Sequence, residues 1–155
     1  MPEPIIGAPA PDFSLPATGN RTIRLADLRG QAVVLYFYPK DSTPGCTQEG
    51  LDFQALAGQF AALGAVILGV SRDSVASHEK FGARQGFTFD LLSDAQETAC
   101  RAYDVIREKN MYGKTVLGIE RSTFLIDADG VLREAWRKVK VKDHAAAVLE
   151  RLKAL

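Results

Sequence analysis

The run of six apolar or aromatic residues from Val33 to Tyr38 is the feature that most constrains how this chain folds. It is too short for an ordinary helix and rich in residues that favour strands, which predicts a strand buried on both faces. Strands of this kind lie at the centre of sheets that helices cover. Residues 39–45 are turn formers and include two prolines, so the chain is expected to leave the sheet there.

A helix is expected directly after this turn. Acidic side chains at Glu49 and Asp52 suit its early turns, and apolar residues recur at helical spacing at Phe53, Leu56, Phe60 and Leu63. Cys46 then lies near a helix N-terminus, where free backbone N–H groups stabilise a thiolate. A packing role for Cys46 is the alternative. The neighbouring turn residues favour a partly exposed, reactive cysteine instead.

The rest of the chain alternates between apolar strands and amphipathic helices. We expect strands at 65–71, 88–92, 122–127 and 131–141, and helices at 74–86, 94–103 and 143–155. A capping-box pattern at 93–96 marks the start of the second of these helices. The N-terminal segment predicts a hairpin that ends with a strand at 22–25, followed by one helical turn at 25–28. Residues 104–118 carry mixed charge and two glycines, which predicts a long loop.

This order of elements predicts the fold class. A strand, a helix and a second strand form a right-handed parallel crossover, and an antiparallel hairpin and a terminal helix follow it. The expected architecture is α/β, with a mixed central sheet, helices on both faces and an N-terminal hairpin. A chain of 155 residues buries enough surface for one core, so a single domain over residues 1–155 is expected.

Composition argues against several classes of function. Nineteen basic and nineteen acidic residues give no net charge, which disfavours a nucleic acid or an anionic membrane as partner. No targeting pattern and no long apolar run is visible, so a cytoplasmic protein is expected. Two cysteines without a Cys-x-x-Cys motif argue against a metal site or a disulfide scaffold. His78 and His144 are expected on the surface, away from metal-ligand spacing.

Pro39, Thr43 and Cys46 together carry a family resemblance. Their spacing resembles the Pro-x-x-x-Thr-x-x-Cys signature of peroxiredoxins, and residues 41–47 resemble the peroxiredoxin Q, or bacterioferritin comigratory protein, branch. Residues 7–13 and 118–124 extend the similarity over nearly the whole chain. The resemblance implies a thioredoxin-like fold and a thiol-dependent peroxidase without a cofactor. Such an enzyme reduces hydrogen peroxide and small organic hydroperoxides through a sulfenic acid on Cys46.

The resemblance also implies roles for neighbouring residues. Arg121 would donate to the thiolate and the peroxide, Thr43 would reach the sulfur, and Pro39 would fix the turn and shield the sulfur from water. Taken alone, these three residues are more often a solvated edge arginine, a turn hydroxyl and a strand terminator. Glu49 has two equally supported interpretations, which are orienting Arg121 and complementing the helix dipole.

The chain departs from the family at the second cysteine. Relatives place it either at the position of Leu51 or in the following helix, where this chain has Gly82 beside Phe81. Cys100 remains and is expected to be a half-buried packing residue. We therefore expect a one-cysteine mechanism in a monomer or weak homodimer, with recycling by glutathione, glutaredoxin or a thioredoxin-type protein. A two-cysteine enzyme resolved by Cys100, a thiol–disulfide oxidoreductase and a chaperone stay open as alternatives.

Overall fold

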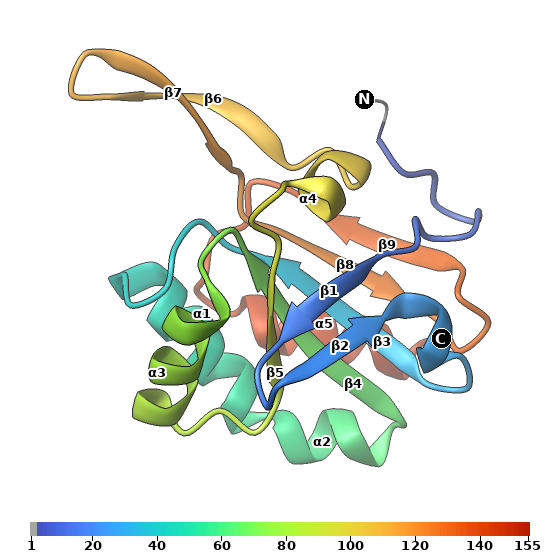
Figure 1. Cartoon of the computed structure of the whole chain (residues 1–155). Coiled ribbons are helices and arrows are strands. Elements are labelled where there is room, and N and C mark those ends of the chain that lie inside the picture. Colours follow the sequence, from blue (N-terminus) through green and yellow to red (C-terminus); the bar gives the residue numbers. More distant parts are fainter. Residues whose placement is uncertain (1–2) are drawn as a thin grey trace.

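A mixed sheet of seven strands forms the centre of the molecule (Figure 1). The computed structural model describes residues 3–155. The strand order is β2-β1-β5-β4-β3-β8-β9. The strands are β1 (Ser14–Ala17), β2 (Arg21–Arg24), β3 (Ala32–Phe37), β4 (Ala65–Ser71), β5 (Asp90–Ser93), β8 (Ser122–Ile126) and β9 (Leu132–Trp136). Strands β6 (Ile106–Met111) and β7 (Lys114–Ile119) form a separate ribbon.

Strand β3 is central, as its apolar run predicts. It pairs in parallel with β4 and antiparallel with β8, and all six of its residues are buried. Its side chains alternate between the two faces of the sheet. Leu35 and Phe37 belong to one apolar cluster, and Val34 and Tyr36 belong to the other. The expectation of a strand buried on both faces is confirmed.

Helices cover both faces of the sheet. Helices α1 (Pro44–Ala55), α2 (Ala57–Ala62), α3 (Val75–Gln85) and α5 (His144–Lys153) pack on one face through Phe53, Phe60, Phe81 and Val148. Helix α4 (Thr98–Ala102) and the 3-10 turn η1 (Leu25–Leu28) pack on the other through Cys100 and Leu25. The predicted fold class is confirmed. No helix in residues 3–155 has the length and apolar character needed to cross a membrane.

The N-terminal hairpin and the parallel crossover also form as predicted. Strands β1 and β2 pair antiparallel, and the turn η1 follows them. The helical connection between β3 and β4 is divided at Leu56, which has a non-helical backbone (φ −102°, ψ 3°). Strands β8 and β9 are antiparallel neighbours, and α5 closes the chain.

The expectation of a long loop at 104–118 is wrong, because this segment is the β6–β7 hairpin. Tyr112 and Gly113 both have positive φ, which makes the two-residue turn that suits the twist of a hairpin. The residues from Met111 to Leu117 are all exposed. A strand without a core-facing side shows no apolar alternation, which explains why the sequence pattern failed here.

Two other elements differ in extent. Helix α4 begins only at Thr98, because Glu97 has φ of 61° and the expected capping box does not form. The carboxylate of Asp94 instead accepts hydrogen bonds from the Thr98 hydroxyl (3.1 Å) and the Cys100 N–H (2.7 Å). The strand expected at 131–141 ends at Trp136, beyond which the N–H of Val139 bonds to the carbonyl of Arg121.

The expectation that both histidines lie on the surface is wrong. His78 and His144 are buried, and each imidazole has internal polar partners. His78 contacts Asp41 and the Leu92 carbonyl, while Nε2 of His144 lies 2.8 Å from the Thr123 hydroxyl. A buried polar side chain is tolerated when it is hydrogen-bonded, and such partners from distant strands are invisible in the sequence.

Candidate active site

Cys46 lies in the first turn of α1, just beyond the carboxyl end of β3. Thr43 is the N-cap residue with an extended backbone, and Pro44 occupies the first helical position, where its missing N–H costs nothing. Cys46 is 2% exposed and belongs to an apolar cluster with Tyr36, Tyr38 and Phe53. The predicted position is therefore confirmed, but the predicted partial exposure is wrong, because Cys46 is buried within this cluster.

Arg121 is brought to Cys46 by the strand order. The antiparallel register pairs Phe37 with Ser122, so the end of β3 meets the start of β8. The Nη2 atom of Arg121 lies 3.5 Å from Sγ of Cys46. A Cβ at Gly45 would lie 3.1 Å from the same Nη2 atom, so the glycine leaves room for this approach. The Arg121 side chain is only 16% exposed, which contradicts a solvated edge position.

Glu49 is the second partner of Arg121. Its Oε1 atom accepts a hydrogen bond of 2.6 Å from Nη1, and its side chain is 1% exposed. Within residues 3–155 its Oε2 atom has no hydrogen-bond partner. Burial raises the pKa of Glu49 to about 7, because loss of water outweighs the attraction of Arg121. The pKa of Arg121 is raised, because its contacts with Glu49 and Cys46 outweigh the effect of burial.

Thr43 and Pro39 shape the turn before Cys46. The Thr43 hydroxyl donates to the Lys40 carbonyl at 2.8 Å, so its single proton is used within the turn. Across the described part of the chain, no hydrogen bond joins Thr43 to the sulfur of Cys46. Pro39 is half-buried and follows β3, where the N–H of Tyr38 makes a last bond to Val70 of β4.

Cys100 lies on the opposite face of the sheet from Cys46. It belongs to the apolar cluster that contains Tyr103 and Phe37, whereas Cys46 belongs to the cluster on the other face, with Phe53. The expected half-burial is wrong, because Cys100 is fully buried. Burial and the nearby Asp94 carboxylate raise the pKa of the Cys100 thiol well above its ordinary value. The structure does not bring the two thiols together.

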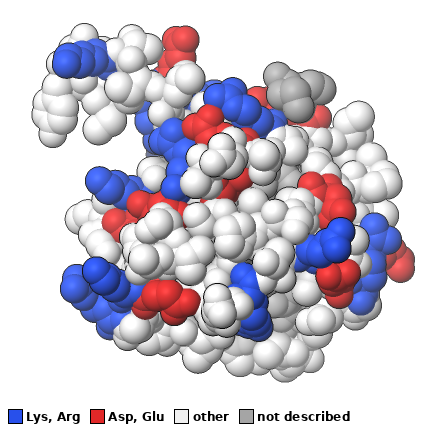
Figure 2. All heavy atoms as spheres, viewed as in Figure 1, with Lys and Arg blue, Asp and Glu red and all other residues white. Residues whose placement is uncertain are grey.

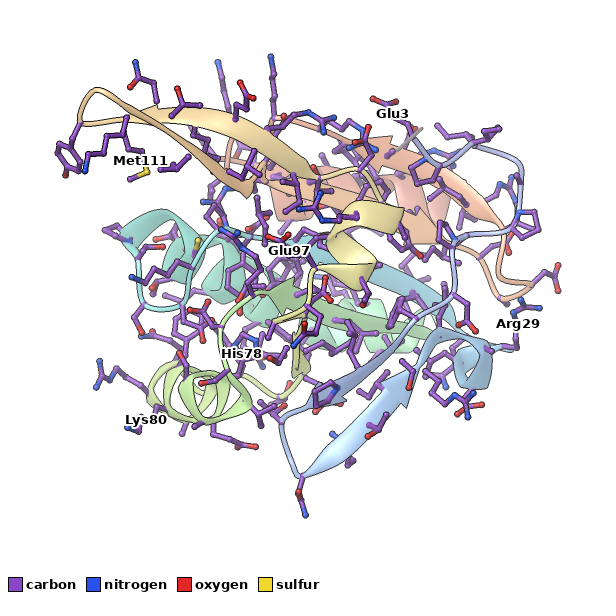
Figure 3. The ribbon with its side chains drawn as sticks, turned by 45° about the horizontal axis from the view of Figure 1, so that its top comes forward. Glu3, Arg29, His78, Lys80, Glu97 and Met111 are labelled. Atoms are coloured by element: carbon purple, nitrogen blue, oxygen red, sulfur yellow. The ribbon has the colours of Figure 1, made fainter. Side chains whose placement is uncertain are left out.

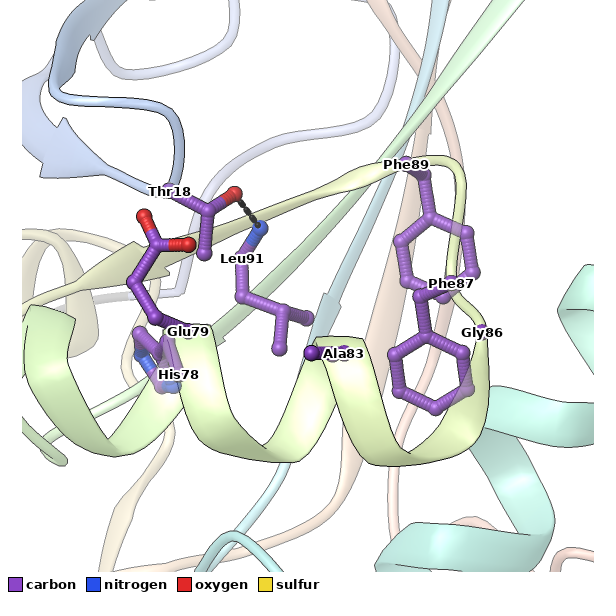
Figure 4. Close-up of a pocket in the computed structure, with 9 residues that line it drawn as sticks. Thr18, His78, Glu79, Ala83, Gly86, Phe87, Phe89 and Leu91 are labelled. Carbon is purple, nitrogen blue, oxygen red and sulfur yellow. Dashed lines mark hydrogen bonds between the residues drawn. The ribbon is translucent and has the colours of Figure 1, made fainter.

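Gly82 lies in α3 beside a separate pocket of about 340 Å³ between α3 and β5 (Figure 4). Thr18, Phe87 and Leu91 also line it, and the Thr18 hydroxyl accepts a hydrogen bond from the Leu91 N–H. A Cβ at Gly82 would meet only Leu91, at 4.0 Å. The helix therefore has room for a side chain at this position, although it carries none.

Sequence reasoning missed a buried polar network that anchors the turn before Cys46. The carboxylate of Asp41 accepts hydrogen bonds from the hydroxyls of Tyr38 (2.6 Å) and Ser77 (2.8 Å), and Nδ1 of His78 lies 2.7 Å from it. Burial alone would raise the pKa of Asp41, but the hydrogen bonds of His78 and Tyr38 hold it below its ordinary value. The only sequence signal is a lone Asp in the turn and a lone His in the helix expected at 74–86.

Comparison with known proteins decides the family. The AhpC/TSA family model matches residues 6–135. Peroxiredoxin Bcp of Xanthomonas campestris is 59% identical, over 99% of this chain and 98% of that protein. Peroxiredoxin Bcp of Bacillus subtilis is 51% identical, over 96% and 94%. The chain belongs to the peroxiredoxins.

Solved structures of peroxiredoxins agree with this family and with the fold. A cysteine-to-serine mutant of PrxQ from Xylella fastidiosa is similar with a TM-score of 0.93 and 50% identity, over 99% of this chain and 98% of the other. Bacterioferritin comigratory protein of Xanthomonas campestris, solved for insight into its alkyl peroxide reduction activity, gives a TM-score of 0.88 and 60% identity, over 92% and 90%.

As a peroxiredoxin, the chain is a thiol-dependent peroxidase with a thioredoxin-like fold. Its substrates are a hydroperoxide and a thiol reductant. The alternative classes, a thiol–disulfide oxidoreductase and a chaperone, are not favoured. Among residues 3–155, no group of three or more His, Cys, Asp or Glu side chains is placed to hold a metal ion.

The raised pKa of Glu49 predicts how Glu49→Gln changes the pH dependence of stability. Between pH 4.5 and about 7 the folded protein holds a proton on Glu49 that the unfolded chain releases. Wild type therefore loses stability relative to Glu49→Gln as pH rises through this window, by up to about 3 kcal/mol. Urea unfolding of both proteins across this pH range measures the difference.

Glu97→Gln is the matched control. Arg72 and Arg101 lower the pKa of Glu97, so the stability that its charge contributes is lost only as pH falls below 4.5. Inside the window, the difference in stability between this variant and wild type should therefore stay constant. Burial lowers the pKa of His144 to about 4, which adds an opposite slope to every variant alike. A constant stability difference between wild type and Glu49→Gln would show that Glu49 titrates normally.

Proposed function

We propose that Cys46 is the nucleophile that reduces the hydroperoxide and that Arg121 is its principal electrostatic partner. The supporting observation is the contact of 3.5 Å between the guanidinium and the sulfur in the first turn of α1. A guanidinium is charged at every physiological pH and presents several donors in a fixed plane. It can therefore stabilise the thiolate and still donate to a bound peroxide.

The reaction is an attack of sulfur on oxygen. The Cys46 thiolate forms a bond to the terminal peroxide oxygen, the O–O bond breaks, and its electron pair leaves with the alkoxide or hydroxide. That anion takes a proton and departs as alcohol or water, and Cys46 is left as sulfenic acid. Negative charge thus moves from sulfur to the leaving oxygen, where preorganised donors give the largest rate effect.

The neighbouring residues position these donors. Glu49 binds Nη1 of Arg121 while Nη2 faces the sulfur, which favours the orienting interpretation over a dipole effect. Thr43 acts when its hydroxyl, which donates to the Lys40 carbonyl here, turns toward the sulfur or the bound oxygen. Pro39 limits access of water at the end of β3.

We propose a one-cysteine cycle in which an external thiol reduces the sulfenic acid. Cys100 lies across the sheet, and Leu51 and Gly82 supply no thiol. The external thiol attacks Sγ of Cys46, water leaves, and a second thiol breaks the mixed disulfide. Glutathione with glutaredoxin, or a thioredoxin-type protein, is the expected reductant. The protein would work in the cytoplasm as a single domain, either monomeric or weakly dimeric.

Two cysteine variants test this assignment. Cys46→Ser should abolish peroxide consumption with dithiothreitol because it removes the nucleophile, and Cys100→Ser should keep it because Cys100 has no part in the cycle. A loss-of-peroxide assay measures both, and circular dichroism establishes that both variants fold. Substantial turnover by Cys46→Ser would refute the nucleophile. Loss of turnover in folded Cys100→Ser would refute the one-cysteine cycle.

Donor variants test the roles of Arg121 and Thr43. Arg121→Ala and Thr43→Val should each slow oxidation of the enzyme by peroxide by about 100-fold or more, since each removes a donor from a site shielded from water. Stopped-flow mixing with hydrogen peroxide measures the rate. Thr43→Ser is the matched control and should stay near wild type, because it keeps the hydroxyl. Wild-type rates in Thr43→Val would show that the Thr43 hydroxyl acts only within the turn.

A further inference from the structure

The β6–β7 hairpin stands away from the rest of the fold (Figure 1). Its strands pair with each other and not with the seven-stranded sheet. A two-stranded hairpin is marginally stable in water unless something covers one face. Four of the nine large apolar side chains exposed in residues 3–155 nevertheless lie on it, at Met111, Tyr112, Val116 and Leu117. Apolar exposure concentrated in this way is typical of a surface that binds a partner.

Tyr112 is the least expected residue of the hairpin. It is 99% exposed and has φ of 53° at the first position of the turn. Asn, Asp or Gly suits this position, whereas a bulky side chain there is strained. Among residues 3–155 no packing compensates for that strain, because the side chain is fully exposed. Folding therefore does not account for an aromatic ring at the tip, and contact with another molecule does.

One face of the hairpin borders the active site. The register places Lys109 opposite Val116 and Met111 opposite Lys114, so these four side chains share a face. Lys109 lies over Gly118, and its ammonium donates to the carbonyl of Ile119, two residues before Arg121. Burial and then Arg121 lower the pKa of Lys109, as expected for a cation beside the site.

The shape of the surface agrees with this placement. Figure 2 shows a hollow between the projecting hairpin and the body, with Lys and Arg side chains along its inner edge. Met111 extends from the hairpin on the side of the molecule that also carries α1 (Figure 3). We call the exposed part of this face, with the turn, the tip face, which consists of Met111, Tyr112, Lys114 and Val116.

We propose that the tip face is the docking surface for a thioredoxin-type protein that reduces Cys46. The inference rests on the one-cysteine cycle above, which leaves the sulfenic acid of Cys46 to an external thiol. The apolar side chains of the tip face are complementary to an apolar patch around the partner's thiol. Lys114, which forms no ion pair within residues 3–155, is complementary to carboxylates at the edge of that patch. A second copy fits less well, since two tip faces would bring their lysines together.

Docking would hold the reductant close to Cys46, whose thiol is buried. Cys46 is 2% exposed, so the first turn of α1 must open before a protein thiol reaches its sulfur. Thr43 gives that turn no side-chain cap, but Asp41 ties the preceding residues to α3, so the open state is a minor one. A reductant held on the hairpin is present whenever the turn opens, so the tip face should affect the reaction with a protein thiol and not with a small one.

The test uses Tyr112→Asn and Met111→Ser in the full-length protein, at saturating hydrogen peroxide. Asn suits the turn, so Tyr112→Asn should unfold at the same or a higher temperature than wild type. With thioredoxin, thioredoxin reductase and NADPH, each variant should lose about 10-fold in kcat/KM for thioredoxin. With dithiothreitol as reductant, turnover should be unchanged. Leu63→Asn, at an exposed apolar position in α2's C-terminal turn, is the matched control.

Four outcomes would overturn the proposal. In the first, both hairpin variants keep wild-type kcat/KM for thioredoxin. In the second, wild type turns over with dithiothreitol but not with thioredoxin, which removes the docking role and leaves the proposed function standing. In the third, wild type fails with both reductants, which refutes the proposed function and the docking role together. In the fourth, sedimentation shows a dimer that Tyr112→Asn dissociates, which assigns the tip face to a second copy.

Discussion

The ion pair between Arg121 and Glu49 is the interaction on which the rest of the active site depends. Glu49 is almost fully enclosed, and its pKa rises to about 7 even though the guanidinium touches it. Removing either partner would leave a buried group without its counter-charge, which is far more costly than losing an exposed pair. The guanidinium is therefore held on one side by Glu49 while its other nitrogen faces the sulfur of Cys46. A cation fixed in this way needs no reorganisation when charge moves during the reaction.

The sheet explains why these three residues meet. Cys46 and Glu49 follow β3 on α1, and Arg121 precedes β8, which is the antiparallel neighbour of β3. Burial of β3 on both faces locks that register, because a shift of one residue would exchange the two sets of buried side chains. The network of Asp41 and His78 then ties the intervening turn to α3 and to the Leu92 carbonyl of β5. The position of Cys46 thus depends on contacts from most layers of the fold.

The sequence predicted those parts of the fold whose residues face a core. The run at 33–38, the alternating elements and the terminal helix all carry apolar periodicity, and each forms. The β6–β7 hairpin carries none, because both its faces are largely exposed, and its sequence therefore predicts a loop. Motif spacing points to Cys46 and Thr43 and the family resemblance points to Arg121, and the structure puts Arg121 against Cys46. The burial of Cys46, His78 and His144 could not be foreseen, since their partners come from distant strands and helices. Pairing between distant elements is a property of the fold that no local pattern records.

The chemical state of the two sulfurs after one turnover tests the central claim most directly. Wild-type protein would be treated with an equimolar amount of hydrogen peroxide in the presence of a sulfenic-acid trapping reagent, then alkylated and analysed by peptide mass spectrometry. The account predicts the trapped sulfenic acid on Cys46 and a free, alkylated thiol at Cys100. A disulfide between Cys46 and Cys100 as the main product would contradict it. That result would require one of the two cysteines to leave its own face of the sheet. It would also make Cys100 part of the catalytic cycle.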